Sequence, residues 1–74
     1  MNKDAVIVNV NGHRMFSDRV PVRIYDWLDQ EGGWHRDRAI AARLGISAAH
    51  VNRSLYRMRN RGIVVKRGAE WKAA

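Results

Sequence analysis

Residues 51–58, with the sequence Val-Asn-Arg-Ser-Leu-Tyr-Arg-Met, decide how this chain folds. At the spacing of an α-helix, the stretch divides into an apolar face and a polar face. The apolar face consists of Val51, Leu55 and Met58. The polar face consists of Asn52, Arg53 and Tyr56. A helix of this kind can pack on a core with one side and present an amide, a guanidinium and a phenol to a ligand with the other.

The charge of the chain indicates what that ligand is. The 74 residues carry a formal net charge of +7, and all but three of the fourteen basic residues are arginines. Residues 36–74 carry ten basic and two acidic side chains, whereas residues 1–35 carry four and five. A field of one sign over half of a small domain predicts a polyanionic partner such as nucleic acid. The plainer interpretation is a solvated surface that favours solubility.

Several other classes of protein find no support in the sequence. There is no cysteine, so neither a disulfide framework nor a thiolate zinc site is available, and His13, His35 and His50 lack the spacing of metal ligands. We therefore predict no metal and no cofactor. No apolar run reaches the ~20 residues of a membrane span, and no signal-peptide pattern opens the chain, so we expect a soluble intracellular protein without membrane contact.

An enzyme is also not expected. The serines have no evident base and orienting acid nearby in the sequence, and no glycine-rich phosphate loop occurs. Ser47 is better explained as a helix cap.

The first nineteen residues are expected to form an amino-terminal β-hairpin or arm, followed by a domain over residues 20–74. Val6–Val10 is a β-type run, Asn11-Gly12 is a strong hairpin signal, and His13–Phe16 can return as the second strand. An isolated hairpin is marginally stable in water. It must therefore pack on the rest of the chain or pair with a second copy, which would make a homodimer.

Two helices are expected before the deciding stretch. The first begins at Pro21, buries Ile24, Trp27 and Leu28, and ends at Gly32-Gly33. A short strand around Trp34 precedes the second helix, which runs from about Asp37 to Leu44.

A tight turn then leads into the third helix. Gly45 supplies a positive φ, and Ser47 caps a helix that extends to about Asn60 or Arg61 before Gly62. Ala41, Gly45 and Val51 have the spacing of a helix-turn-helix.

Two extended runs follow, at residues 63–65 and 70–72, joined by a basic turn over residues 66–69. The whole pattern predicts an α+β fold, a winged helix-turn-helix with three helices and a small antiparallel β-wing.

The residues from about Val20 to Lys72 resemble the Zα domain family, whose members bind left-handed Z-form DNA and RNA. The resemblance is carried by residues 51–58, by the Leu44-Gly45 turn, by Gly62 and by Trp71-Lys72. It implies that Tyr56 lays its ring against a syn guanine and that Asn52 and Arg53 bind phosphate. It also implies that Trp71 supports the tyrosine while it approaches the nucleic-acid backbone.

The chain departs from many relatives in two places. Ala48 and Ala49 stand where those relatives place lysines, and the wing lacks a threonine-proline-proline run. We expect Lys66, Arg67 and Lys72 to replace these contacts electrostatically.

Two other functions stay open on the sequence alone. One is a sequence-specific winged-helix regulator of right-handed DNA, such as a phage repressor or an excisionase-like protein, which inserts the third helix into the major groove. The other is a protein-interaction domain with an acidic partner. Within the Z-form interpretation, the choice between a DNA duplex and an RNA duplex is open, and Tyr56 could instead serve only as a lid on the core beside Trp71.

Overall fold

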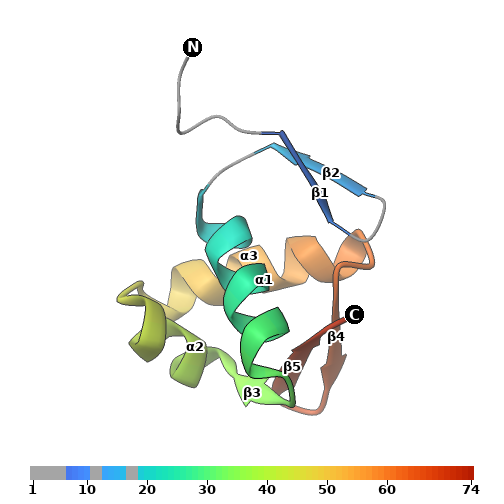
Figure 1. Ribbon diagram of the computed structural model, residues 1–74. Coiled ribbons are helices and arrows are strands. Elements are labelled where there is room, and N and C mark those ends of the chain that lie inside the picture. Colours follow the sequence, from blue (N-terminus) through green and yellow to red (C-terminus); the bar gives the residue numbers. More distant parts are fainter. Residues whose placement is uncertain (1–6, 11–12, 17–18) are drawn as a thin grey trace.

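The computed structural model describes residues 7–10, 13–16 and 19–74, with side chains from Arg19 onward (Figure 1). It contains three helices and two small antiparallel sheets, and the core has the predicted winged helix-turn-helix fold. The elements are β1 (Ile7–Val10), β2 (His13–Phe16), α1 (Arg19–Glu31), β3 (His35–Arg36), α2 (Asp37–Leu44), α3 (Ala48–Asn60), β4 (Val64–Arg67) and β5 (Glu70–Ala73). In the described part of the chain, no helix is long and apolar enough to cross a membrane.

The amino-terminal hairpin is present as expected. Strands β1 and β2 pair antiparallel from Ile7 opposite Phe16 to Val10 opposite His13, and they form a sheet of their own. The expected turn residues Asn11 and Gly12 lie outside the described residues. In Figure 1 the hairpin lies above α1, at the opposite end of the molecule from β3.

The helix bounds follow local sequence signals. Helix α1 begins at Arg19, two residues before the predicted start, and Pro21 is tolerated because the N–H groups of a first turn have no partner within the helix. Gly45 adopts φ 67° and its N–H donates to the carbonyl of Ala41, which ends α2. The Oγ of Ser47 accepts from the N–H of His50 at 3.2 Å, so the predicted cap of α3 is confirmed.

The wing is more regular than the sequence indicated. Strand β5 lies between β3 and β4, and both neighbours are antiparallel to it. The expected four-residue turn is wrong, because Lys66 and Arg67 continue β4 and Arg67 pairs with Glu70. The loop shrinks to Gly68 and Ala69, with Gly68 at φ 58°.

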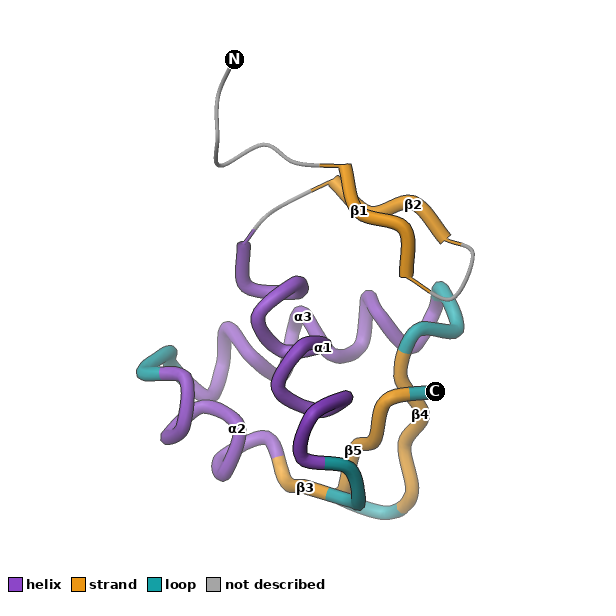
Figure 2. The backbone as a smooth tube through the Cα atoms, viewed as in Figure 1, coloured by secondary structure: helices purple, strands orange, loops and turns teal. Residues whose placement is uncertain are grey.

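The core lies where the three helices meet the inner face of this sheet. Figure 2 shows α1 crossing in front of α3, with the three-stranded sheet at the lower right. Among residues 19–74, Trp71 is the largest fully buried side chain of this core. The buried apolar residues are Ile24, Leu28, Ile40, Ala41, Val51, Leu55, Met58, Ile63, Val64 and Trp71. They include the whole predicted apolar face of residues 51–58, so burial of this face fixes which side of α3 meets solvent.

Candidate nucleic-acid interface

The exposed side of α3 forms a ridge along one face of the molecule. Ala49, Arg53, Tyr56 and Asn60 follow one another at helical spacing, and all four are exposed. Tyr56 is 42% exposed, so part of its ring is open to a ligand. Asn60 was not singled out by sequence reasoning, although its place one turn beyond Tyr56 could have indicated it.

Tyr56 is supported from below by Trp71 of β5. The two ring centroids lie 5.0 Å apart at an interplanar angle of 87°, an edge-to-face pair. Such pairs contribute about 0.5–1.5 kcal/mol beyond the area they bury. The predicted convergence of phenol and indole is therefore present, and the contact fixes the orientation of the exposed ring.

Trp71 itself does not lie on the surface. Trp71 is 1% exposed, whereas the resemblance implied an indole that approaches the nucleic-acid backbone while it supports Tyr56. The difference arises because β5 is the central strand of the wing and places Trp71 on the inner face of the sheet, against the helices. The indole thus contacts the exposed ring of Tyr56 from within the core.

Asn52 lies half-buried at the edge of the ridge and is held by another helix. Its Nδ2 donates to Oδ2 of Asp37 at 3.0 Å, while Oδ1 of Asp37 accepts from the N–H of Arg38 at 2.8 Å. A carboxylate can only accept, so this contact requires the amide nitrogen to face Asp37. The second amide hydrogen and the amide oxygen remain for a ligand. Sequence reasoning missed Asp37, because the contact joins residues in different helices.

Lys66 belongs to the same side of the sheet as Trp71. The two residues are directly opposite in the register of β4 and β5, and the Nζ of Lys66 lies 5.6 Å from the centroid of the indole. The ammonium also donates to the carbonyl of Gly68 in the wing turn. The wing therefore supplies one cation next to the Tyr56–Trp71 pair.

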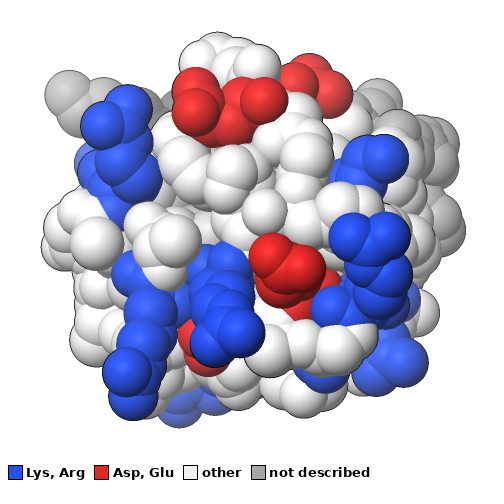
Figure 3. All heavy atoms as spheres, turned by 90° about the horizontal axis from the view of Figure 1, so that it is seen from below, with Lys and Arg blue, Asp and Glu red and all other residues white. Residues whose placement is uncertain are grey.

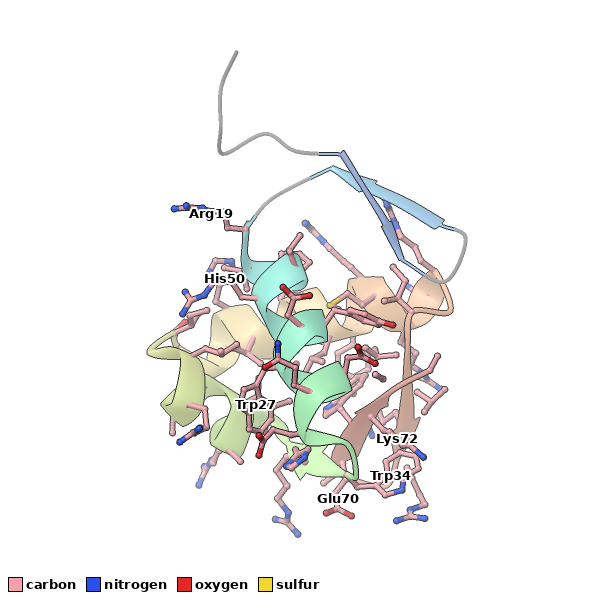
Figure 4. The ribbon with its side chains drawn as sticks, in the orientation of Figure 1. Arg19, Trp27, Trp34, His50, Glu70 and Lys72 are labelled. Carbon is pink, nitrogen blue, oxygen red and sulfur yellow. The ribbon has the colours of Figure 1, made fainter. Side chains whose placement is uncertain are left out.

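Arg67 and Lys72 lie on the opposite face of the sheet from Lys66 and Trp71. Side chains alternate between the two faces of a strand, so these neighbours of Lys66 and Trp71 project from the outer face of the sheet. There the Cζ of Arg67 lies 4.2 Å from the ring centroid of Trp34, and the Nζ of Lys72 lies 5.7 Å from it. Figure 4 shows Trp34 and Lys72 together at the lower right, with Glu70 nearby. Sequence reasoning grouped all three wing cations into one site, and the structure separates Lys66 from the other two.

The chain carries an excess of basic residues, with fourteen Lys and Arg against seven Asp and Glu. Figure 3, a view from the side of β3 and the wing, shows basic side chains on both sides of this face and carboxylates near its centre and upper edge.

Among residues 19–74, no group of three His, Cys, Asp or Glu side chains is placed to hold a metal ion.

The solved structures that are similar to this chain include two domains studied with Z-DNA. No protein-family model matches this chain. No curated protein matches it either. The Zα domain of ORF112 from cyprinid herpesvirus 3, determined in its binding mode to Z-DNA, superposes with a TM-score of 0.73 at 30% sequence identity. That match covers 78% of this chain and 97% of the viral domain.

The second structure is the Zβ domain of human DAI, studied in solution together with its binding modes to B- and Z-DNA. Its TM-score is 0.68 at 34% identity, and the match covers 80% of this chain and 88% of the human domain.

Proposed function

This chain belongs to the Zα domain family, and on that premise we propose that it recognises left-handed Z-form duplexes by the shape of their backbone, through α3 and the β-wing. Binding is the whole of the proposed activity, without a catalytic step.

The observation that carries the proposal is the exposed phenol of Tyr56, held edge-on by a buried indole. Contact between an aromatic side chain and a base is worth about 1–3 kcal/mol. In right-handed DNA the bases are stacked inside the duplex, whereas the family resemblance implies a syn guanine exposed on the Z-form surface. A ring that is fixed before binding loses little conformational entropy when it meets such a base.

The groups around Tyr56 suit contacts to phosphate. Arg53 is exposed on the same ridge, Asn52 keeps one amide hydrogen free, and Lys66 approaches from the wing. Contacts to phosphate position a protein without reading the sequence of bases. These donors therefore follow the path of a backbone, which is what distinguishes a left-handed duplex from a right-handed one.

The viral Zα structure concerns Z-DNA alone and the DAI Zβ structure concerns both B- and Z-DNA, so Z-DNA is the ligand that they share. This favours the proposal over a sequence-specific regulator of right-handed DNA. The proposal extends to left-handed RNA duplexes, because phosphates and an exposed base ring occur in both nucleic acids.

Circular dichroism of an alternating CG duplex tests the proposal directly. In moderate salt, the protein is expected to invert the long-wavelength bands of the duplex as it converts to the left-handed form. If the spectrum keeps its right-handed shape at saturating protein, the proposal is wrong.

We predict that Tyr56→Ala abolishes this conversion while the domain stays folded, because Tyr56 is 42% exposed and is not among the buried core residues. Tyr56→Phe is the matched control, since it keeps the ring and its edge-to-face contact with Trp71, and it should retain most of the conversion. Far-ultraviolet circular dichroism of the free variants checks the fold. Conversion by Tyr56→Ala at the level of the parent would remove the ring from the interface.

A further inference from the structure

The outer face of the three-stranded sheet carries a cationic surface that the α3 site does not use. We name it the outer sheet face and define it by the residues that project away from the helices. These residues are Trp34, Arg36, Val65, Arg67, Glu70 and Lys72. In the register of the sheet, Glu70 lies opposite both Arg36 and Arg67, and Lys72 lies opposite Val65.

Two cations of the outer sheet face, Arg67 and Lys72, lie close to the ring of Trp34. The guanidinium of Arg67 lies 4.2 Å from the centroid of Trp34, close enough for stacking, and the ammonium of Lys72 lies 5.7 Å from the same centroid. Stacking on an indole engages the flat face of a guanidinium and leaves its N–H edge free to form paired hydrogen bonds with a phosphate. The ring thereby orients Arg67 before any ligand arrives.

The positive charge of the outer sheet face exceeds the negative charge of its own carboxylate. Arg36, Arg67 and Lys72 are exposed, and in the part of the chain that the structure describes none of them forms an ion pair with Glu70. Three cations against one carboxylate leave a net positive surface with donors available. Exposed Val65, at 41%, adds a small apolar area beside Lys72.

We infer that the outer sheet face is a second phosphate-binding surface, which grips the backbone of a second nucleic-acid segment while α3 holds the first. This inference rests on the proposed function of the α3 site. Because the sheet separates Tyr56 and Trp71 from Trp34 and Arg67, a duplex on α3 leaves the outer sheet face open. One domain can then bridge two duplexes.

A capture assay tests the bridge. An immobilised alternating CG duplex is saturated with the 74-residue chain and washed, and a fluorescent duplex of mixed sequence is then added in low salt. The parent is expected to retain the second duplex. Added unlabelled duplex should release it far better than poly-glutamate at equal charge; equal release by poly-glutamate would overturn the assignment to nucleic acid.

Matched variants separate this surface from general electrostatics. Arg67→Ala should lower capture of the second duplex at least tenfold, with less than a twofold effect on conversion of the CG duplex. Arg43→Ala removes the same charge from an exposed position in the last turn of α2 and should leave both readouts near the parent values. Equal capture by these two variants would overturn the inference.

Two further readouts keep the result unambiguous. In ¹H–¹⁵N spectra of the complex with the CG duplex, the indole N–H of Trp34 should shift on addition of the second duplex, whereas that of Trp71 should not. If the parent inverts the CG spectrum but captures no second duplex, the inference fails and the proposed function stands. If it does not invert the spectrum, the proposed function itself fails.

Discussion

At the scale of single residues, two side chains that we propose to face the ligand are held in place by neighbours outside the proposed interface. Trp71 fixes the ring of Tyr56, and Asp37 fixes the amide of Asn52. Each arrangement limits side-chain motion before binding, which lowers the entropy lost on association. Asp37 also places a negative charge close to the expected path of the phosphates. The carboxylate therefore has two opposing effects on affinity.

Substitutions at Asp37 separate these two effects. Asp37→Asn keeps an oxygen that can accept from Asn52 and removes the charge, so it should bind the CG duplex more tightly than the parent. Asp37→Ala removes both the accepting oxygen and the charge. It should bind the CG duplex about fivefold more weakly than Asp37→Asn, which corresponds to the loss of a hydrogen bond of about 1 kcal/mol. Fluorescence anisotropy at constant salt measures the affinities.

The control for Asp37 is the same pair of substitutions in an Asn52→Ala background. Without the amide to hold, Asp37→Ala and Asp37→Asn should bind equally, since only the shared loss of charge remains. A fivefold difference that persists in this background would show that Asp37 acts through another partner.

Arg53 offers a measurement of phosphate contact. Its guanidinium is exposed on the ridge beside Tyr56. Arg53→Ala should weaken binding and reduce the slope of log affinity against log salt by roughly one unit, as expected for one phosphate contact. An unchanged slope would place Arg53 outside the interface.

At the scale of the elements, the turn between α2 and α3 determines the direction of the recognition helix. Gly45 adopts the left-handed conformation, and its N–H and that of Ile46 both bond to the carbonyl of Ala41, the Ile46 bond measuring 3.1 Å. Two donors on one carbonyl close the end of α2 tightly. Ser47 then caps α3, so that only Gly45, Ile46 and Ser47 separate the two helices.

Gly45→Ala should destabilise the domain through its backbone alone. A side chain at this position would meet no atom within 4 Å, but its φ of 67° costs an L-residue roughly 1–2 kcal/mol. We expect the melting temperature to fall by about 4–8 °C per kcal/mol in a domain of this size. The melting temperature of Gly45→Asn should fall by less, because asparagine tolerates this conformation. Equal losses of melting temperature in both variants would point to a cause other than φ.

At the scale of the whole molecule, the amino-terminal hairpin and the wing form two different sheets. Strands β1 and β2 pair only with each other, whereas β3, β4 and β5 form the three-stranded sheet. The division into an arm over residues 1–19 and a domain over residues 20–74 therefore remains a proposal that deletion can test. Arg19 starts α1, so the deletion is best made before it.

A chain that begins at Arg19 should unfold within a few degrees of the parent and convert CG duplexes equally well. Sedimentation of both chains tests the proposed homodimer: a dimeric parent and a monomeric deletion would assign self-association to the hairpin. A large loss of thermal stability in the deletion would show that the hairpin packs on the core.

The sequence by itself determined the elements and the central features of the site. Periodicity over residues 51–58 predicted the buried and exposed faces of α3. Gly45 and Ser47 predicted where this helix begins, and Gly62 predicted where it ends. These signals could be read because helical spacing, caps and positive φ are local properties of the chain. The resemblance also identified Tyr56 and Trp71 as partners. These predictions depended on residues close in sequence or on a known pattern.

Only the tertiary structure decided which side of the wing each cation occupies, that Trp71 is buried, and that Asp37 holds Asn52. Each of these facts depends on how separate elements pack. A shift of one residue in a strand moves its side chains to the other face, so the four-residue turn expected at 66–69 left the faces of Lys66 and Arg67 undefined. The hydrogen bond between Asp37 and Asn52 likewise exists because α2 and α3 meet, and local sequence carries no signal for such a contact.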